Sequence, residues 1–395
     1  MAGTADRVEQ LQQAMDESGV DAAVLRLAEN VVLTTRWYVP IPGLALVVVG
    51  RAGGATLLVP EYEADEAAEV WRGDIRTFPA IRNDGPPPGV EIERHLRELA
   101  AEHGAAGGVV GYEGSFEAIA PGSIHGEPNA VALPTQGLIK RTFETEQLQD
   151  VTETLEALRA VKSGEEVELI RRTNEIAMFG LEAFKDHAVP GKTEVEVMAE
   201  VEHAISVRGH GYKGARWVRG FCTIQSGPDL VNGWQYWRAR PRTIEPDDLV
   251  MLELGTGADG YWSDHTRTVV AGKANGRVRE AYDAVHAAAR AAFAAAKPGA
   301  SGDDVDRSSR EACAAAGFTQ FPHHTGHGTG FRYHESRPQL VPGGTDVLSA
   351  GNVIVTEPGI YERELNGGVR HEDNAVVTAD GAVVLATTDY AFDLA

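Results

Sequence analysis

Residues 252–268 read LELGTGADGYWSDHTRT and carry two carboxylates, Glu253 and Asp264, within apolar strand-like runs. A carboxylate among Val, Met, Leu and Trp side chains must be paired, protonated or bound to a cation, because burying an isolated charge is costly. The two acidic residues lie eleven positions apart. This segment therefore predicts a buried acidic site, and its further members must come from elsewhere in the chain.

Three later segments each offer further candidate metal ligands. They read HHTGHGTGFRYHE (323–335), TEPGIY (356–361) and GGVRHEDNAVVT (367–378). They contribute His327, which lies between two glycines, and the carboxylates Glu357 and Glu372, which adjoin apolar runs. Converging carboxylates would repel one another, whereas divalent cations would neutralise them. Carboxylate oxygens with one imidazole suit Mn²⁺, Co²⁺ or Fe²⁺ better than an ion that prefers thiolates.

The periodicity of apolar residues predicts two domains of different class. The first third alternates helix and short apolar strands, which is typical of an α/β domain. A helix predicted over residues 144–162 separates the two halves. The second half combines helices with short β-branched runs between glycine-rich turns, which predicts an α+β domain rather than a parallel βαβ array. Its predicted helices cover residues 164–184, 193–209, 278–296 and 303–316.

In their order and context, these segments resemble those of the pita-bread metallohydrolases, a family that includes prolidase, aminopeptidase P, methionine aminopeptidase and creatinase. The family pattern is Asp, then Asp in D-x-T-R-T, His in G-H-G-x-G, Glu in E-P-G and Glu in R-x-E-D. Asp264, His327, Glu357 and Glu372 match the last four positions. Glu253 stands where the peptidases of the family usually have Asp, so the first position departs from the pattern.

The resemblance implies a fold and a dinuclear metal centre. Residues 1–155 would form a smaller creatinase-like α/β domain, and residues 156–395 the pita-bread catalytic domain, of class α+β. Two divalent ions would bind, with Mn²⁺ as the first expectation and Co²⁺, Fe²⁺ or Zn²⁺ as alternatives. Members of the family are usually homodimers, and we expect the same here.

The resemblance also implies catalytic roles. His334 would hydrogen-bond the substrate carbonyl or the tetrahedral intermediate, and Glu357 would accept the proton of the attacking water. His323 would be a further pocket histidine, and we prefer it to the adjacent His324 because neighbouring side chains rarely face the same cavity. Arg370 would tether the last metal-binding segment and contact the substrate, with a purely structural ion pair as its alternative role.

The loop LVNGWQYWRARP (230–241) offers candidate substrate-binding side chains. Tyr236 lies seventeen positions before Glu253, where proline-specific peptidases tend to have a substrate-binding histidine. Trp234 and Trp237 flank it, so we expect an aromatic pocket wall. Such a wall suits a proline ring, and it equally suits a cationic or zwitterionic small molecule through cation–π contact.

Three functions are compatible with this pattern. The first is a metal-dependent hydrolase resembling Xaa-Pro dipeptidase or aminopeptidase P, which would cleave a C–N bond of a small peptide with a metal-bound hydroxide. The second is an enzyme resembling creatinase, ectoine hydrolase or dimethylsulfoniopropionate lyase, with a small zwitterionic or cationic substrate; Glu253 and Tyr236 favour it. The third is a catalytically silent binding module, which the retention of several costly buried carboxylates argues against.

Charge and cysteine content limit the partners and the compartment. The 395 residues include 36 Lys and Arg and 58 Asp and Glu, for a net charge of −22. This negative field repels nucleic acids and anionic membranes, so we expect neither as a partner. Two cysteines, Cys222 and Cys313, cannot build a disulfide framework. They suit the cytoplasm, where we expect the protein.

Overall fold

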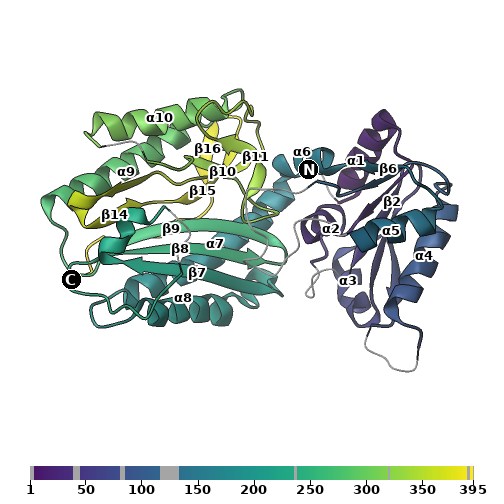
Figure 1. Ribbon diagram of the computed structural model, residues 1–395, viewed down its shortest axis with the longest axis horizontal. Coiled ribbons are helices and arrows are strands. Elements are labelled where there is room, and N and C mark those ends of the chain that lie inside the picture. Colours follow the sequence, from purple (N-terminus) through teal and green to yellow (C-terminus); the bar gives the residue numbers. More distant parts are fainter. Residues whose placement is uncertain are drawn as a thin grey trace. The chain divides into compact units, whose positions relative to one another are not determined.

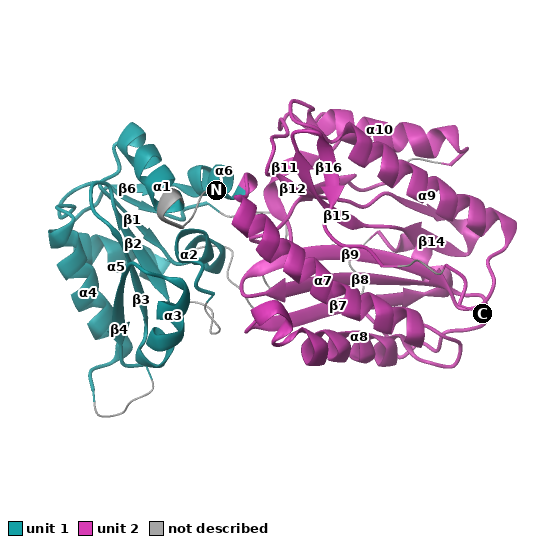
Figure 2. Ribbon diagram, turned by 180° about the vertical axis from the view of Figure 1, so that it is seen from behind, with its two compact units in different colours: residues 1–159 teal, residues 160–395 magenta. Residues whose placement is uncertain are grey.

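The computed structural model describes residues 4–38, 45–80, 85–115, 133–234, 238–318, 321–388 and 392–394. The chain divides into two compact units, residues 1–159 and residues 160–395 (Figures 1 and 2). Within the described residues, no helix combines the length and the apolar character needed to cross a membrane.

Unit 1 is built on a six-stranded sheet with the strand order β4-β3-β2-β1-β5-β6. β1, β2 and β3 pair antiparallel, whereas β4, β5 and β6 join the sheet in parallel. The strands are β1 (Ala22–Leu25), β2 (Leu46–Gly50), β3 (Ala55–Pro60), β4 (Asp74–Phe78), β5 (Val110–Tyr112) and β6 (Leu148–Asp150). The helices are α1 (Thr4–Ser18), α2 (Ala28–Thr35), α3 (Ala64–Val70), α4 (Pro88–Glu102), α5 (Leu133–Phe143) and α6 (Thr152–Ala160). This mixed sheet with its helices confirms the predicted α/β class.

The single helix predicted over residues 144–162 is wrong. Residues Leu148–Asp150 form β6, in which Leu148 pairs with Val110 of β5, and α6 begins only at Thr152. The Asp150 carboxylate accepts hydrogen bonds from the backbone N–H groups of Thr152 and Gly114, both at 2.9 Å. Pairing with a distant strand and a capping carboxylate thus override the helical spacing of the leucines.

The first half of unit 2 is an antiparallel sheet covered by two helices. β7 (Val218–Ser226), β8 (Leu249–Ala258) and β9 (Tyr261–Val270) pair in the order β7-β8-β9. α7 (Gly164–His187) and α8 (Glu194–Gly209) pack against this sheet, and α7 passes in front of it in Figure 2. Each helix begins with a capping box, Ser163 with Glu166 and Thr193 with Glu196. These caps fix where each helix begins, and both helices lie where the helical spacing of apolar residues predicted them.

The second half of unit 2 pairs two helices with a five-stranded sheet. α9 (Gly276–Ala295) and α10 (Gly302–Ala315) confirm the remaining predicted helices. The sheet has the order β11-β10-β12-β15-β16, and β13 pairs separately with β14. These strands are β10 (Gly326–Gly328), β11 (Glu335–Leu340), β12 (Val353–Thr356), β13 (Gly359–Glu362), β14 (Gly367–Arg370), β15 (Asp373–Thr378) and β16 (Gly381–Val384). Short 3₁₀ helices occupy Glu61–Glu63, Tyr212–Gly214, Gly227–Asn232 and Arg363–Leu365. Unit 2 is therefore α+β, as predicted.

Candidate metal centre

The candidate metal ligands come from five separate stretches of unit 2. Glu253 lies in β8 and Asp264 in β9; in this register Thr266 is opposite Glu253. His327 is the middle residue of β10. Glu357 directly follows β12 and Glu372 directly precedes β15. Because Thr356 pairs with Asp373 in the antiparallel β12–β15 ladder, the next residues outward, Glu357 and Glu372, lie opposite each other.

The ligand atoms of these residues form one continuous buried cluster. In each of three overlapping groups, the atoms lie within 4.8 Å of one another: Asp264 with His327 and His334, His324 with His327 and Glu357, and Glu253 with Asp264 and Glu372. Nε2 of His327 is 3.5 Å from Oδ2 of Asp264 and 3.6 Å from Oε1 of Glu357. The structure therefore brings together all five candidate ligands.

Several buried atoms of this cluster have no hydrogen-bond partner among the residues that the structure describes. They are Oδ1 of Asp264, Nε2 of His324, Nε2 of His327, Oε1 of Glu357 and Oε1 of Glu372. An unsatisfied buried polar atom costs about 1–3 kcal/mol. Nδ1 of His327 is 2.8 Å from the carbonyl oxygen of Gly328, which favours the tautomer whose Nε2 lone pair faces the cluster. Unsatisfied oxygen and imidazole lone pairs fit a divalent ion.

The pKa values in the cluster reflect the crowding of its carboxylates. Burial raises the pKa of Asp264 to about 6, although the His327 imidazole opposes the shift. Burial and the charges of Asp264 and Glu357 raise the pKa of Glu372 well above its usual value. Burial would also raise the pKa of Glu357, but the imidazoles of His324, His323 and His327 lower it to about 2. Bound cations would remove the repulsion among these carboxylates.

Glu253, the residue that departs from the family pattern, is held by neighbouring protein groups. Arg370 forms an ion pair with Oε2 of Glu253. The hydroxyl of Thr266 lies 2.9 Å from the same oxygen, and the hydroxyl of Tyr333 donates to Oε1 at 2.6 Å. Sequence reasoning did not find Thr266 or Tyr333. The available signals were the alternation of β9, which puts Thr266 on the face of Asp264, and the position of Tyr333 directly before His334.

His323 and His324 both line a cavity next to the cluster, although only one of them was expected to face it. His334 is close to Asp264, with 3.0 Å between Nε2 and Oδ2. His323, the preferred pocket histidine, has Nδ1 2.8 Å from the His324 carbonyl oxygen and Nε2 3.1 Å from the Tyr361 hydroxyl. His324 instead has its Nε2 2.7 Å from Oε1 of Glu357. The two histidines precede β10 in irregular backbone, so the alternation of a strand does not separate them.

A cavity of about 40 Å³, room for bound water, lies next to the cluster. Trp234 lines it, as predicted for an aromatic wall, and its side chain is partly exposed. Tyr236 and Trp237 lie outside the described residues. The cavity is lined by Thr223, Gln225, Gly233, Trp234, Met251, Glu253, His323, His324, Glu357 and Arg370.

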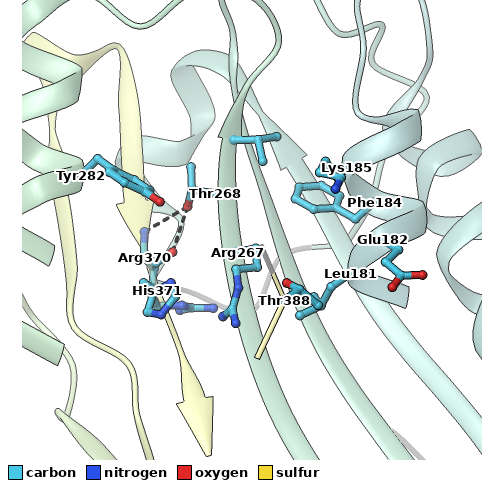
Figure 3. A pocket seen from close by; sticks show the side chains of 11 residues that line it. Leu181, Glu182, Phe184, Lys185, Arg267, Thr268, Tyr282, Arg370, His371 and Thr388 are labelled. Atoms are coloured by element: carbon cyan, nitrogen blue, oxygen red, sulfur yellow. Dashed lines mark hydrogen bonds between the residues drawn. The ribbon is translucent and has the colours of Figure 1, made fainter. Parts of the chain in front are cut away.

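A second small cavity of about 30 Å³ lies where residues of α7, α9, β9 and the end of β14 meet (Figure 3). Arg267 of β9 lines this cavity, donates a hydrogen bond to the carbonyl oxygen of Glu372 and forms an ion pair with Asp373. The Thr268 hydroxyl bonds both the N–H and the carbonyl oxygen of Arg370, as the dashed lines in Figure 3 show. The polar groups of this cavity thus anchor the segment that carries Glu372.

Comparisons with known proteins agree with this geometry. Residues 168–379 match the model of Metallopeptidase family M24, and residues 7–161 match that of the Creatinase/Prolidase N-terminal domain. The chain is 31% identical over 385 residues to the Xaa-Pro dipeptidase of Pyrococcus furiosus, covering 97% of this chain and 98% of that protein. It is 29% identical to the putative dipeptidase YkvY of Bacillus subtilis, covering 98% and 99% of the two chains.

Solved structures show the same likeness. The prolidase from Pyrococcus horikoshii superposes with a TM-score of 0.78 at 28% identity, covering 98% of this chain and 99% of that one. The prolidase from Pyrococcus furiosus gives a TM-score of 0.76 at 30% identity, covering 96% and 100%. With its ligand cluster, its two-unit fold and these matches along nearly the whole chain, the protein belongs to Metallopeptidase family M24 and is a metallohydrolase.

Proposed function

We propose that the protein is an Xaa-Pro dipeptidase, which hydrolyses the imide bond of a dipeptide ending in proline. The observation that carries the proposal is the convergence of unsatisfied atoms of Asp264, His327, Glu357 and Glu372 beside a cavity lined by Trp234. The full-length similarity to a Pyrococcus furiosus protein named Xaa-Pro dipeptidase supports this substrate class over a non-peptide zwitterion.

Asp264, His327, Glu357 and Glu372 would hold the divalent ions, with Glu253 as the remaining carboxylate. Bound divalent ions supply a water of lowered pKa and polarise the substrate carbonyl. We propose two ions and Mn²⁺ as the physiological metal, because the donor set is rich in carboxylate oxygens.

The side chains around the ions would position the substrate and move protons. The low pKa of Glu357 keeps its carboxylate ionised at neutral pH, so it can accept a proton from water and pass it on. His334, next to Asp264, would donate a hydrogen bond to the substrate carbonyl and to the tetrahedral intermediate. His323 and Arg370 line the cavity and would contact the substrate there.

The aromatic residues of the loop at 230–241 would provide the proline pocket. Trp234 lines the cavity, and Tyr236 and Trp237 follow it closely in sequence. A flat aromatic face packs well against a pyrrolidine ring, which is apolar and rigid. We propose these three residues as the wall that favours proline after the scissile bond.

We further propose a cytoplasmic homodimer without nucleic-acid or membrane partners. The net charge of −22 disfavours binding to polyanions. Cys222 and Cys313 are both free and buried, which suits a reducing compartment.

The test uses protein that has been stripped with a chelator and reloaded with Mn²⁺. We expect cleavage of Gly-Pro, little cleavage of Gly-Ala, and loss of at least about a thousandfold of kcat in Asp264→Asn. Mn²⁺-loaded protein that leaves Gly-Pro intact would reject the proposal. Turnover of a small quaternary-ammonium zwitterion by the same sample would favour the non-peptidase alternative.

A further inference from the structure

We infer that His324 is an additional nitrogen ligand of the metal centre, beside His327. The residue lies outside the five-position ligand pattern of the family. The inference rests on the proposed function only in requiring that the centre binds a divalent ion; it does not depend on the substrate.

The first support is the geometry around Glu357. One ring nitrogen of His324, one of His327 and an oxygen of Glu357 all lie within 4.8 Å of one another. The same oxygen, Oε1, is 2.7 Å from the His324 nitrogen and 3.6 Å from the His327 nitrogen. Two imidazole nitrogens thus lie near one carboxylate oxygen, so a single ion could be bound by all three groups.

The second support is that these atoms lack other partners. Nε2 of His324, Nε2 of His327 and Oε1 of Glu357 are buried without a hydrogen-bond partner among the described residues. The 2.7 Å approach of His324 to Glu357 is close, yet it lacks the alignment of a hydrogen bond. A metal ion would use all three lone pairs at once, and burying them would then carry no penalty.

The adjacent histidine provides a contrast within the same segment. Both ring nitrogens of His323 have partners, the carbonyl oxygen of His324 and the hydroxyl of Tyr361. His323 therefore has no unused ring nitrogen to offer. Its side chain lines the same cavity as His324, so the two residues differ in their partners and not in their access to the site.

The direction of approach makes the second imidazole compatible with the first. His327 is fully buried in β10, whereas the His324 side chain is 31% exposed and lines the cavity. His327 would bind from the sheet and His324 from the cavity side. Their ring centroids are 5.5 Å apart and the ring planes meet at 82°, so the two rings pack edge to face rather than stacked.

A second nitrogen changes which metals the centre prefers. Imidazole suits Zn²⁺, Co²⁺ and Fe²⁺, whereas all-oxygen sites suit Mn²⁺. The His324 side of the centre should therefore bind Co²⁺ more tightly, relative to Mn²⁺, than a centre with one imidazole. Replacing His324 with a carboxylate should shift the preference back toward Mn²⁺.

The experiment compares four full-length proteins: wild type, His324→Gln, His324→Asp and the matched control His323→Gln. Each is loaded with Mn²⁺ alone, and pulsed electron paramagnetic resonance counts the nitrogen nuclei coupled to the ion. Calorimetric titrations with Co²⁺ and with Mn²⁺ give the affinities. No substrate is added, so the outcome is independent of dipeptidase activity.

We expect two coupled imidazole nitrogens in wild type and in His323→Gln, and one in His324→Gln. Co²⁺ affinity should fall at least about tenfold in His324→Gln. His324→Asp should bind Mn²⁺ more tightly than His324→Gln does, while showing only one coupled nitrogen. A single coupled nitrogen in wild type overturns the inference, as does an unchanged nitrogen count in His324→Gln. Two nitrogens in a protein that does not cleave Gly-Pro would uphold the inference while rejecting the proposed substrate.

Discussion

The hydroxyl of Tyr333 donates a 2.6 Å hydrogen bond to Oε1 of Glu253. On its other oxygen, Glu253 pairs with Arg370. Glu is one methylene longer than the Asp usual in the family, which extends the reach of its carboxylate. Protein donors therefore already occupy both oxygens of the first ligand position. An ion bound at Glu253 must compete with them, whereas the side of the centre at Glu357 and His327 has unsatisfied atoms.

Removing the Tyr333 hydroxyl should strengthen metal binding at Glu253. A hydrogen bond to a charged group contributes about 1.5–3 kcal/mol, so Tyr333→Phe should tighten the weaker of two Mn²⁺ binding events by about tenfold. Calorimetric titration measures both events. Tyr361→Phe is the control, because its hydroxyl contacts His323 rather than Glu253. Equal or weaker second-ion affinity in Tyr333→Phe would contradict the competition.

Replacing Arg370 should make the metal-free protein strongly dependent on added ions. The Arg370 side chain is buried, and without it Glu253 keeps an uncompensated buried charge, which typically costs about 3–5 kcal/mol. Arg370→Met should therefore melt at a lower temperature than wild type without metal. Its melting temperature should rise more than that of wild type when Mn²⁺ is added. Calorimetric scans with and without Mn²⁺ measure both effects. Arg307→Met, at an exposed pair with Asp303, serves as the control. An equal rise in melting temperature on adding Mn²⁺ in Arg370→Met and wild type would contradict this role of the Arg370–Glu253 ion pair.

Chelation should destabilise unit 2 and leave unit 1 unchanged. The candidate ligands all lie in unit 2, where the metal-free centre leaves carboxylates crowded and atoms unsatisfied. Saturation at a hundred times the dissociation constant stabilises a fold by about 2.7 kcal/mol. Hydrogen exchange of the whole chain with and without Mn²⁺ should show added protection in β8, β9, β10 and β12, and none in β1–β6. Equal changes in both units would be inconsistent with a centre confined to unit 2.

Glu113 of unit 1 should make stability fall as the pH rises. Its carboxylate accepts hydrogen bonds from the backbone N–H groups of Arg26 and Leu27 and from the Asn30 side chain. Burial nevertheless raises the pKa of Glu113 from 4.5 to about 7. The folded state then holds this proton more tightly than the unfolded state, so its contribution is greatest below pH 4.5 and is lost as the pH rises to about 7.

The matching variant is Glu113→Gln, which does not titrate. Its stability relative to wild type should increase between pH 5 and pH 8, by at most about 3 kcal/mol. Melting curves across this range measure the change, with the exposed Glu9→Gln as the control. A difference that stays flat with pH would show that Glu113 titrates at its ordinary value.

Local signals predicted the helices of unit 2 well. Apolar residues at helical spacing located α7 and α8, and in the structure Ser163 with Glu166 and Thr193 with Glu196 form the capping boxes that begin them. The helix predicted over residues 144–162 was wrong for a non-local reason, because Leu148 pairs with Val110, which is distant in sequence. Periodicity contains no information about such partners.

The class of both units and the set of metal-ligand candidates could be predicted from the amino-acid sequence alone. A carboxylate in an apolar strand must be paired, protonated or bound to a cation whatever the topology, so Asp264, Glu357 and Glu372 could be identified as candidates from their flanking residues. The partners of each candidate ligand, in contrast, depend on the three-dimensional fold. The pairing of Glu253 with Arg370 and Tyr333, and the approach of His324 to Glu357, join segments that lie far apart or in irregular backbone. Such contacts depend on distances between strands and on side-chain reach, which no local pattern of residues specifies.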